Sequence, residues 1–182
     1  MDKGIGVAMS TAIFRELAVY NRWANARIYA AAFELSEGQL KRPVGIFFES
    51  LHGTLNHLLA TDLIWLKRLT GEGDAPNRLD FVLHDHLREL AIDREAQDRR
   101  IVSVVEAYEE ADLNRVLQYM TTKGQPLQQR IGDVLLNLFN HQTHHRGQAH
   151  ACYSILTGAE PPVLDLLQFQ LGQPAPDLSL LI

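Results

Sequence analysis

The sequence is poor in cysteine, with Cys152 as the only one among its 182 residues. No disulfide can form within such a chain, and this scarcity of thiols is typical of the reducing cytoplasm. An excess of basic residues is also missing, because 17 Lys and Arg stand against 22 Asp and Glu and leave a net charge of -5. A chain without a positive field has little to hold a phosphate backbone, so we expect no nucleic acid among its partners.

Long apolar runs are missing as well, since no stretch approaches the roughly 18 consecutive apolar residues that a membrane span needs. The beginning of the chain carries a lone Lys3 and no sustained apolar segment, so we expect neither an export signal nor a membrane partner. The sequence also lacks the G-x-S-x-G, P-loop and G-x-G-x-x-G fingerprints, because Gly4-Ile5-Gly6 has no strand before it. These features together predict a cytoplasmic protein.

The composition is that of an ordinary globular protein, with 46% hydrophobic and 21% charged residues. A chain of this length can bury a sizeable core. It contains no internal repeat and no linker long enough to separate two units. We therefore expect a single domain over residues 1–182.

Four segments repeat apolar residues every three or four positions, which is the period of an amphipathic helix. The third segment is rich in Asp, Glu and Arg, and we interpret these charges as a face exposed to solvent. The first begins after the cap Ser10 or Thr11 and ends near Leu35, and the others cover residues 51–69, 84–108 and 132–156.

Residues 114–131 alternate in polarity around a turn from Thr121 to Pro126, which predicts a small hairpin. The Pro161-Pro162 pair introduces a short C-terminal segment from Val163 to Leu171. Four long amphipathic helices predict an all-α fold, a four-helix bundle with a small hairpin before the last long helix. Cofactor sites in such bundles are built from side chains that point inward between helices.

Four of the eight histidines fall within residues 141–150, on the last predicted helix. His141 and His145 are one turn apart and about 40° apart around the helix, so one face can offer two imidazoles to one metal ion. They continue an apolar stripe that runs from Ile131 to Leu156. Buried imidazoles need polar partners, and the alternative to a metal ion is that each imidazole is hydrogen-bonded to a carbonyl or carboxylate. For a pair at this spacing we favour a metal site.

A metal site needs a further ligand from another helix, and His57 is the best candidate. Its neighbours one turn away are small, including Gly53 and Ala60, and would leave room for a metal, a water and a substrate. His52 lies about 140° around the same helix. The remaining candidates, His84, His86 and His150, are assigned to the surface or to helix ends.

Several other side chains have two plausible roles. Asp62 interrupts an apolar helix face, so its carboxylate needs a cation or an imidazole N–H. An ion pair with Arg22, Arg27 or Arg146 would serve equally well. Tyr20 and Trp23 are core or rim aromatics at helical spacing, or they line a cavity. Cys152 belongs to an apolar line, and we interpret it as a core residue rather than a nucleophile.

Three segments together resemble the DinB/YfiT-like superfamily of metalloenzymes, which is distinct from the DNA polymerase of similar name. The most specific of them is the HQTHHRGQ run at residues 141–148. The others are YNRWAN at residues 20–25 and LNHLLATDLIWLKRL at residues 55–69, and residues 161–167 are similar to the C-terminal segment of the family.

The resemblance implies helices in up-down-down-up order, a homodimer, and a divalent ion, nickel or zinc, held by three histidines. Carried over by position, these ligands are His57, His141 and His145, the same three that spacing selects. Relatives include transferases and isomerases that use a low-molecular-weight thiol. We therefore expect a metal-dependent enzyme, a thiol S-transferase or a hydrolase of small molecules. Candidates to lie beside the metal or to line its cavity are Asp62, Tyr20, Trp23 and Arg146.

The alternative is a non-catalytic bundle in which the ion has a structural role or serves to sense stress. Structural ions usually have four protein ligands, whereas three ligands leave positions open for chemistry. Three convincing ligands therefore favour an enzyme. A fourth ligand from Asp62 or Cys152 would reverse that preference.

Overall fold

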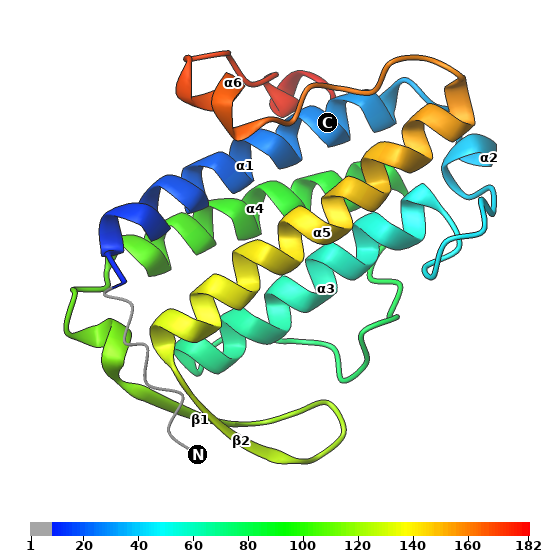
Figure 1. The fold of residues 1–182 in the computed structure, drawn as a ribbon. Helices are drawn as coiled ribbons and strands as arrows, with labels where there is room; N and C mark the ends of the chain where they lie inside the picture. The colour runs from blue at the N-terminus through cyan, green and yellow to red at the C-terminus, as the bar shows by residue number, and fades with distance from the viewer. Residues whose placement is uncertain (1–8) are drawn as a thin grey trace.

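The computed structural model describes residues 9–182, and Lys3 and Gly4-Ile5-Gly6 lie outside the described residues. The fold is dominated by four long helices, with a two-stranded sheet between the last two of them (Figure 1). None of the described helices has the length and apolarity needed to cross a bilayer. The long helices are α1 (Thr11–Phe33), α3 (Leu51–Thr70), α4 (Leu87–Glu106) and α5 (Ile131–Thr157), and the shorter elements are α2 (Glu37–Leu40), η1 (Asp112–Asn114), β1 (Val116–Met120), β2 (Pro126–Arg130), α6 (Leu166–Gln170) and η2 (Leu178–Leu180).

The long helices form a four-helix bundle in which α1 and α3 each pack against both α4 and α5. Figure 1 shows α1 and α5 running one way and α3 and α4 the other, which is the expected up-down-down-up order. Because α3 and α4 are parallel neighbours, residues 71–86 must return along the full length of the bundle. This long return passes beside α3, and the carbonyl of Leu79 within it contacts His57 of that helix.

Local sequence signals define the ends of the helices. The hydroxyl of Ser10 accepts a hydrogen bond from the amide of Ala12, and that of Ser50 accepts one from Gly53. Gly71 and Gly158 end α3 and α5 with positive φ angles of 76° and 69°. The boundaries predicted from periodicity are therefore close, although α4 begins at Leu87 and not near His84.

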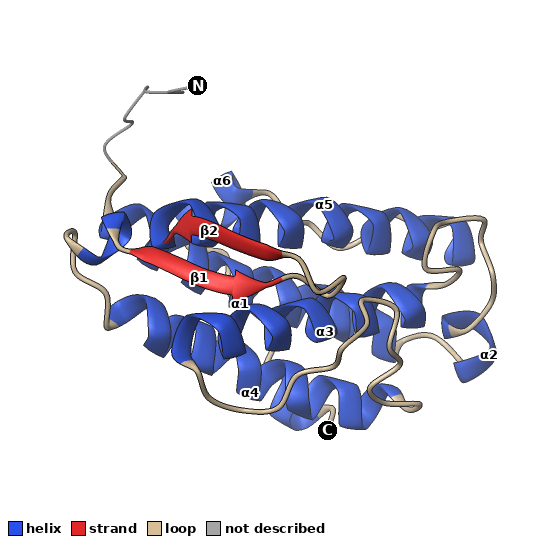
Figure 2. Ribbon diagram, turned by 90° about the horizontal axis from the view of Figure 1, so that it is seen from below, coloured by secondary structure: helices blue, strands red, loops and turns tan. Residues whose placement is uncertain are grey.

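The predicted hairpin is present, with β1 and β2 antiparallel and Tyr119 opposite Leu127. Figure 2 shows it beside one half of the bundle, with its strands running roughly along the long helices. Tyr119 packs edge-on against Trp65 of α3 with the ring centres 5.4 Å apart. The guanidinium of Arg68 lies over both rings. The hairpin thus covers apolar surface near the end of α3.

The core contains two large apolar clusters with a buried polar layer between them, and a third, small cluster of Tyr20, Trp23 and Ala24 lies beside the C-terminal segment. One large cluster includes Ile28, Leu55 and Leu90, and the other includes Phe14 and Ile101. Each long helix contributes polar side chains at positions between its contributions to the two clusters. These are Asn21 and Asn25 of α1, Asp62 of α3, Arg94 and Asp98 of α4, and Gln142 and Arg146 of α5, each at most 3% exposed.

The polar layer corrects the interpretation of α4 as a helix whose charges all face solvent. Arg94 is 1% exposed and pairs with Asp62 at 2.7 Å and with Asp98 at 3.0 Å. Burial raises the pKa of Asp98 to about 6, although Arg94 acts in the opposite direction. Such a pair is difficult to predict in a charge-rich helix, because the sequence does not distinguish the Arg and Asp residues that are buried from those that face solvent.

After α5 the chain crosses back over α1 (Figure 1). Side chains of α1 hold this C-terminal segment, residues 159–182, through its backbone carbonyls. The Tyr20 hydroxyl donates to the carbonyl of Leu164 at 2.7 Å, and the Trp23 indole donates to that of Gln173 at 2.7 Å. Arg27 donates to the carbonyl of Val163 at 2.7 Å. The segment expected over residues 163–171 includes the short helix α6.

Candidate metal centre

Three histidines from two helices converge at the contact between α3 and α5. One possible ligand atom from each of His57, His141 and His145 can be chosen so that all three lie within 4.8 Å of one another. The Nε2 atoms of His57 and His141 are 3.2 Å apart, and the rings of His141 and His145 have their centres 4.3 Å apart. Within residues 9–182 this group contains no carboxylate and no thiol. The fold thus brings together the three histidines that the sequence selected.

The histidines of α5 occupy the edge of the interface rather than the centre of the core. His57 is 3% exposed, whereas His141 and His145 are half-buried. The fully buried positions of this turn are Gln142 and Arg146 instead. The other members of the predicted apolar stripe are buried, so only its two histidine positions lie at the edge; the buried members are Ile131, Leu135, Leu138, Ala149, Cys152 and Leu156. This edge position keeps the imidazoles within reach of a small ligand.

Hydrogen bonds to Nδ1 orient two of the rings. The carbonyl of Leu79 lies 2.7 Å from Nδ1 of His57, and Oε1 of Gln148 lies 2.7 Å from Nδ1 of His145. Each oxygen accepts the Nδ1 proton, which leaves Nε2 with a lone pair. This arrangement of a second partner behind each imidazole is the usual one for metal-binding histidines.

The electrostatics keep the imidazoles neutral. Burial and, to a smaller extent, the neighbouring His145 lower the pKa of His57 to about 4, although the hydrogen bond to the carbonyl of Leu79 acts in the opposite direction. Burial and then the rings of His145 and His57 lower the pKa of His141 to about 3. The pKa of His145 is also lowered by burial. Near neutral pH all three are therefore unprotonated, as metal ligands must be.

An aromatic side chain from the loop before α3 covers the cluster. The ring of Phe48 stacks on that of His57 with the ring centres 3.8 Å apart. It meets the ring of His145 in an edge-to-face arrangement with the ring centres 5.5 Å apart. The loop can come this close because Gly53 has no side chain. A Cβ at this position would lie only 2.1 Å from the carbonyl oxygen of Phe48. Glycine at position 53 is thus required for the placement of Phe48.

A cavity of about 640 Å³ lies on the outer side of Phe48 and Leu79. Its wall includes Phe47, which is 85% exposed, and Phe81, which is 46% exposed. Both belong to the loops that flank the start of α3. None of the three clustered histidines lines this cavity, but Phe48 and Leu79, which both contact His57, belong to its wall.

The other predicted site residues lie elsewhere in the structure. Asp62 belongs to the buried polar layer, where its partner is Arg94 and none of the arginines expected from the sequence. Tyr20 and Arg146 lie between α1 and α5, and Trp23 contacts the C-terminal segment. No hydrogen bond or ring contact among residues 9–182 joins these four to the three histidines.

The histidines that were left out of the site also have separate surroundings. His52 is buried beside the Asn56 amide, with 3.2 Å between its Nε2 and the amide nitrogen. His84 lies 3.1 Å from Asp93. His86 is exposed at the N-cap of α4, and His150 is half-buried on α5. Cys152 is fully buried in the apolar core, as expected.

Three groups beside the histidines were missed by sequence reasoning. Phe48 and the carbonyl of Leu79 belong to loops, where no periodicity indicates direction. Gln148 could have been found, because it follows His145 by three residues on one helix and this spacing places the two side chains together.

The donor set fits a divalent cation. Three neutral imidazoles are a common set for zinc, nickel, copper or iron, and three ligands leave positions open. The Nε2 atoms of His57 and His141 lie 3.2 Å apart, so that a proton on His141 Nε2 can be shared between them, and a cation bound by both nitrogens would take the place of that proton. The geometry is therefore that of a site that favours a positive charge at its centre.

Comparisons with known proteins agree on one family. The family model described as the DinB family matches residues 9–177. Among curated proteins, Protein DinB of Bacillus subtilis (strain 168) is 26% identical over 145 residues, covering 75% of this chain and 81% of that protein. A DinB-like protein from Bacillus cereus ATCC 10987 has a similar fold, with a TM-score of 0.63 over 94% of this chain and 99% of that chain, at 16% identity.

Proposed function

This chain belongs to the DinB family, and from this membership and its histidine cluster we propose that it is a metal-dependent enzyme. His57, His141 and His145 would together hold one divalent ion, nickel or zinc. The proposal is supported above all by the convergence of three imidazoles, two of which, His57 and His145, have a free Nε2 because their Nδ1 proton is already bound.

The residues around the cluster have separate tasks in this proposal. Leu79 and Gln148 hold two imidazoles in one tautomer and orientation, so that little ordering is needed when the ion binds. Phe48 covers His57 and excludes water from that side. A bound divalent ion supplies a Lewis acid that lowers the pKa of a thiol or water and polarises a carbonyl or leaving group.

The substrate we propose is a small molecule that reacts with a low-molecular-weight thiol or with water. Phe47 and Phe81 beside the site would contact its apolar part. Asp62, Tyr20, Trp23 and Arg146 were also candidates for this cavity, but their contacts place them in the polar layer and along α1. A homodimer stays a prediction, to be checked by light scattering of the purified protein.

The experiment that tests the metal site is elemental analysis of tag-free protein purified without added metal. We expect about one equivalent of nickel or zinc per chain, and loss of the metal from His57→Ala and from the His141→Ala/His145→Ala double variant with helicity retained. His144→Ala is the matched control, because this exposed histidine of α5 lies outside the cluster. Full metal content in His57→Ala would remove His57 from the site.

Activity is tested separately on the metal-loaded protein. Cysteine and monochlorobimane form a fluorescent thioether when the thiolate displaces chloride, and we expect wild type but not His57→Ala to accelerate this reaction. Loaded wild type that accelerates neither this reaction nor the hydrolysis of small esters would favour the non-catalytic bundle. Metal-free wild type that stays folded and takes up no added ion would overturn the proposal altogether.

A further inference from the structure

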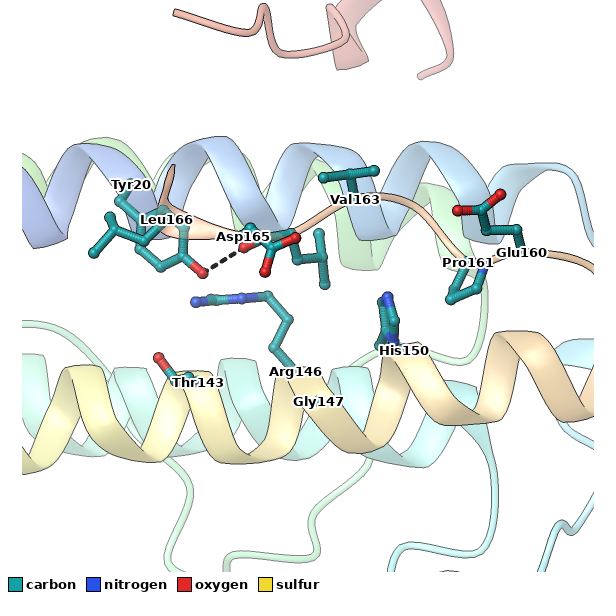
Figure 3. Close-up of a pocket in the computed structure, with 11 residues that line it drawn as sticks. Tyr20, Thr143, Arg146, Gly147, His150, Glu160, Pro161, Val163, Asp165 and Leu166 are labelled. Carbon is teal, nitrogen blue, oxygen red and sulfur yellow. Dashed lines mark hydrogen bonds between the residues drawn. The ribbon is translucent and has the colours of Figure 1, made fainter. Parts of the chain in front are cut away.

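A second cavity lies on the face of α5 opposite the metal-binding histidines. It has a volume of about 610 Å³ and runs between α5, α1 and the C-terminal segment (Figure 3). We call it the Arg146 groove. Thr143, Gly147 and His150 of α5 line it, and they lie about 140° to 240° around the helix from His141 and His145.

The groove contains a buried cation without a direct anionic partner. Arg146 is 2% exposed, and its Nη1 donates to Oδ1 of Asn21 at 2.6 Å and of Asn25 at 3.1 Å. No carboxylate of residues 9–182 forms an ion pair with it. In Figure 3 the guanidinium reaches from α5 towards Tyr20, beneath the C-terminal segment. A buried charge normally has an ion-pair partner, so this position favours an anionic group from a ligand.

The ring of Tyr20 contacts Arg146 directly, with its centre 5.3 Å from Cζ, but the carboxylates of the polar layer compensate Arg146 only through intermediaries. Asn25 donates to Asp98 at 2.9 Å and Asn21 at 3.2 Å, while Asp98 itself pairs with Arg94. Burial lowers the pKa of Arg146, and the Tyr20 phenol, Asp98 and Asp62 act in the opposite direction. A carboxylate in the groove would supply the direct counter-charge that these amides only relay.

Carboxylates also line the groove, on the C-terminal segment. Glu160 and Asp165 belong to its lining and are exposed. Together with Arg146 they give the lining two acids and one permanent cation. A polyanion such as phosphate would therefore face net repulsion, whereas a ligand with both charges would find a partner for each.

The remaining surface of the groove sets its preference for ligand size and polarity. Pro161, Val163 and Leu164 supply apolar wall, and Tyr20 fixes this wall through its bond to the carbonyl of Leu164. A Cβ built on Gly147 meets nothing within 4 Å, so open space lies directly over α5. The groove thus combines a buried cation, exposed acids, apolar wall and free volume.

We propose that the Arg146 groove binds a small zwitterion, an α-amino acid with an apolar side chain. Its carboxylate pairs with Arg146 and its ammonium group with Glu160 or Asp165, while the side chain lies against Val163 and Leu164. The site is separate from the three histidines and does not depend on a bound metal.

The test is calorimetric titration with L-leucine and two analogues that each lack one charge. 4-Methylpentanoate has no ammonium group, and 3-methylbutylamine has no carboxylate. Because amino acids also chelate metals, the titration uses metal-free His57→Ala protein as well as wild type. We expect leucine to bind both proteins equally and at least about tenfold more tightly than either analogue or inorganic phosphate, as loss of a charged partner predicts.

Two variants locate the binding. Gly147→Phe fills the groove without touching any charge, and Asp165→Asn removes an exposed carboxylate without touching the core. We expect Gly147→Phe to abolish leucine binding and Asp165→Asn to weaken it several-fold, with unchanged circular dichroism. Ala151→Phe is the matched control, because Ala151 is exposed on the same helix outside the groove, and it should bind like wild type.

Three outcomes would overturn the proposal. Wild type that binds no leucine removes the site, and equal binding by Gly147→Phe moves the ligand elsewhere. Phosphate or 4-methylpentanoate that binds as tightly as leucine shows that the ammonium group has no partner. None of these results bears on the metal content of the histidine cluster, so the two proposals fail independently.

Discussion

At the scale of single residues, Gln148 is the side chain that acts most directly on an imidazole of the proposed metal site. Its Oε1 accepts the Nδ1 proton of His145, and no other hydrogen bond of residues 9–182 holds that ring. We expect Gln148→Ala to lower the affinity for zinc about 10- to 100-fold, the usual cost of losing such a partner. Competition with a chelating dye measures it. Gln128→Ala on exposed β2 is the control, and equal affinity in both variants would contradict the role of Gln148.

The pH dependence of metal binding belongs to the same scale. Protons compete for an imidazole only below its pKa, and burial lowers that of His57 to about 4 and that of His141 to about 3. We expect the affinity for zinc to be nearly constant from about pH 8 to about pH 6 and to fall below about pH 5. Titration calorimetry across this range checks it. A loss that begins near pH 6.5, the ordinary value for histidine, would contradict it.

The same shifts have a consequence for the metal-free protein, and its sign follows from linkage. Between pH 6.5 and about 4 the unfolded chain binds a proton at His57 that the folded chain does not, so this group reduces stability as pH falls. Asp98, with its pKa raised to about 6, has the opposite effect over about pH 4 to 6. The effects of His57 and Asp98 on the free energy of unfolding therefore partly offset each other as the pH falls.

Residue identity was the part of the site that the sequence could predict. His141 and His145 were found by their spacing, and His57 by its small neighbours and the family resemblance. Phe48 and Leu79 could not be found, because their contacts depend on loop paths that no periodicity encodes.

At the scale of elements, the loop before α3 depends on one close approach. The missing side chain of Gly53 lets the carbonyl of Phe48 lie where a Cβ would be. We expect Gly53→Ala to displace the loop, to cost about 1–3 kcal/mol of stability and to weaken zinc binding. Urea unfolding and dye competition measure the two effects. Gly38→Ala, with nothing within 4 Å of the new Cβ, should be neutral or stabilising. Unchanged stability in Gly53→Ala would show that the loop adapts freely.

The second element-scale prediction concerns α4 and the polar layer. Arg94→Met would leave Asp62 and Asp98 buried without their cation. We expect a loss of about 3–5 kcal/mol at pH 7. The loss should be smaller near pH 5, because the pKa of both acids is already raised by burial and protonation removes their charge. Urea unfolding at both pH values checks this. Arg88→Met, on the exposed face of α4, should cost little, and an equal loss at both pH values would contradict the account.

Helix positions followed from periodicity, but the interior of α4 did not. Arg94 and Asp98 belong to the charges that the sequence assigned to the exposed face, yet both are buried. Arg94 and Asp98 pair within α4, but the other partner of Arg94 is Asp62 of α3, and the order of residues along a chain does not show which helices pack together.

At the scale of the whole molecule, the histidine cluster connects α3 to α5 across the bundle. An ion that binds only the folded state stabilises it in proportion to its affinity. At a hundredfold excess of zinc over its dissociation constant, we expect the melting temperature to rise by about 5–10 °C. Scanning fluorimetry measures the rise, which His57→Ala should abolish and His144→Ala should retain. An equal rise in His57→Ala would locate the zinc elsewhere.

The topology was predicted by the family resemblance rather than by the residues. Periodicity gives four helices, but it does not distinguish up-down-down-up from up-down-up-down. The length of residues 71–86 is compatible with a parallel crossover between α3 and α4, and the structure shows that it makes one.

The attachment of the C-terminal segment has an evolutionary consequence. Tyr20, Trp23 and Arg27 hold the segment by its carbonyl oxygens, a group that every amino acid possesses. Its path is therefore encoded partly in α1, while side chains of the segment, among them Phe169 and Leu178, also pack against the bundle. Substitutions at Glu160 or Asp165 can accumulate without detaching the segment, so related proteins could acquire different ligand preferences along one conserved scaffold.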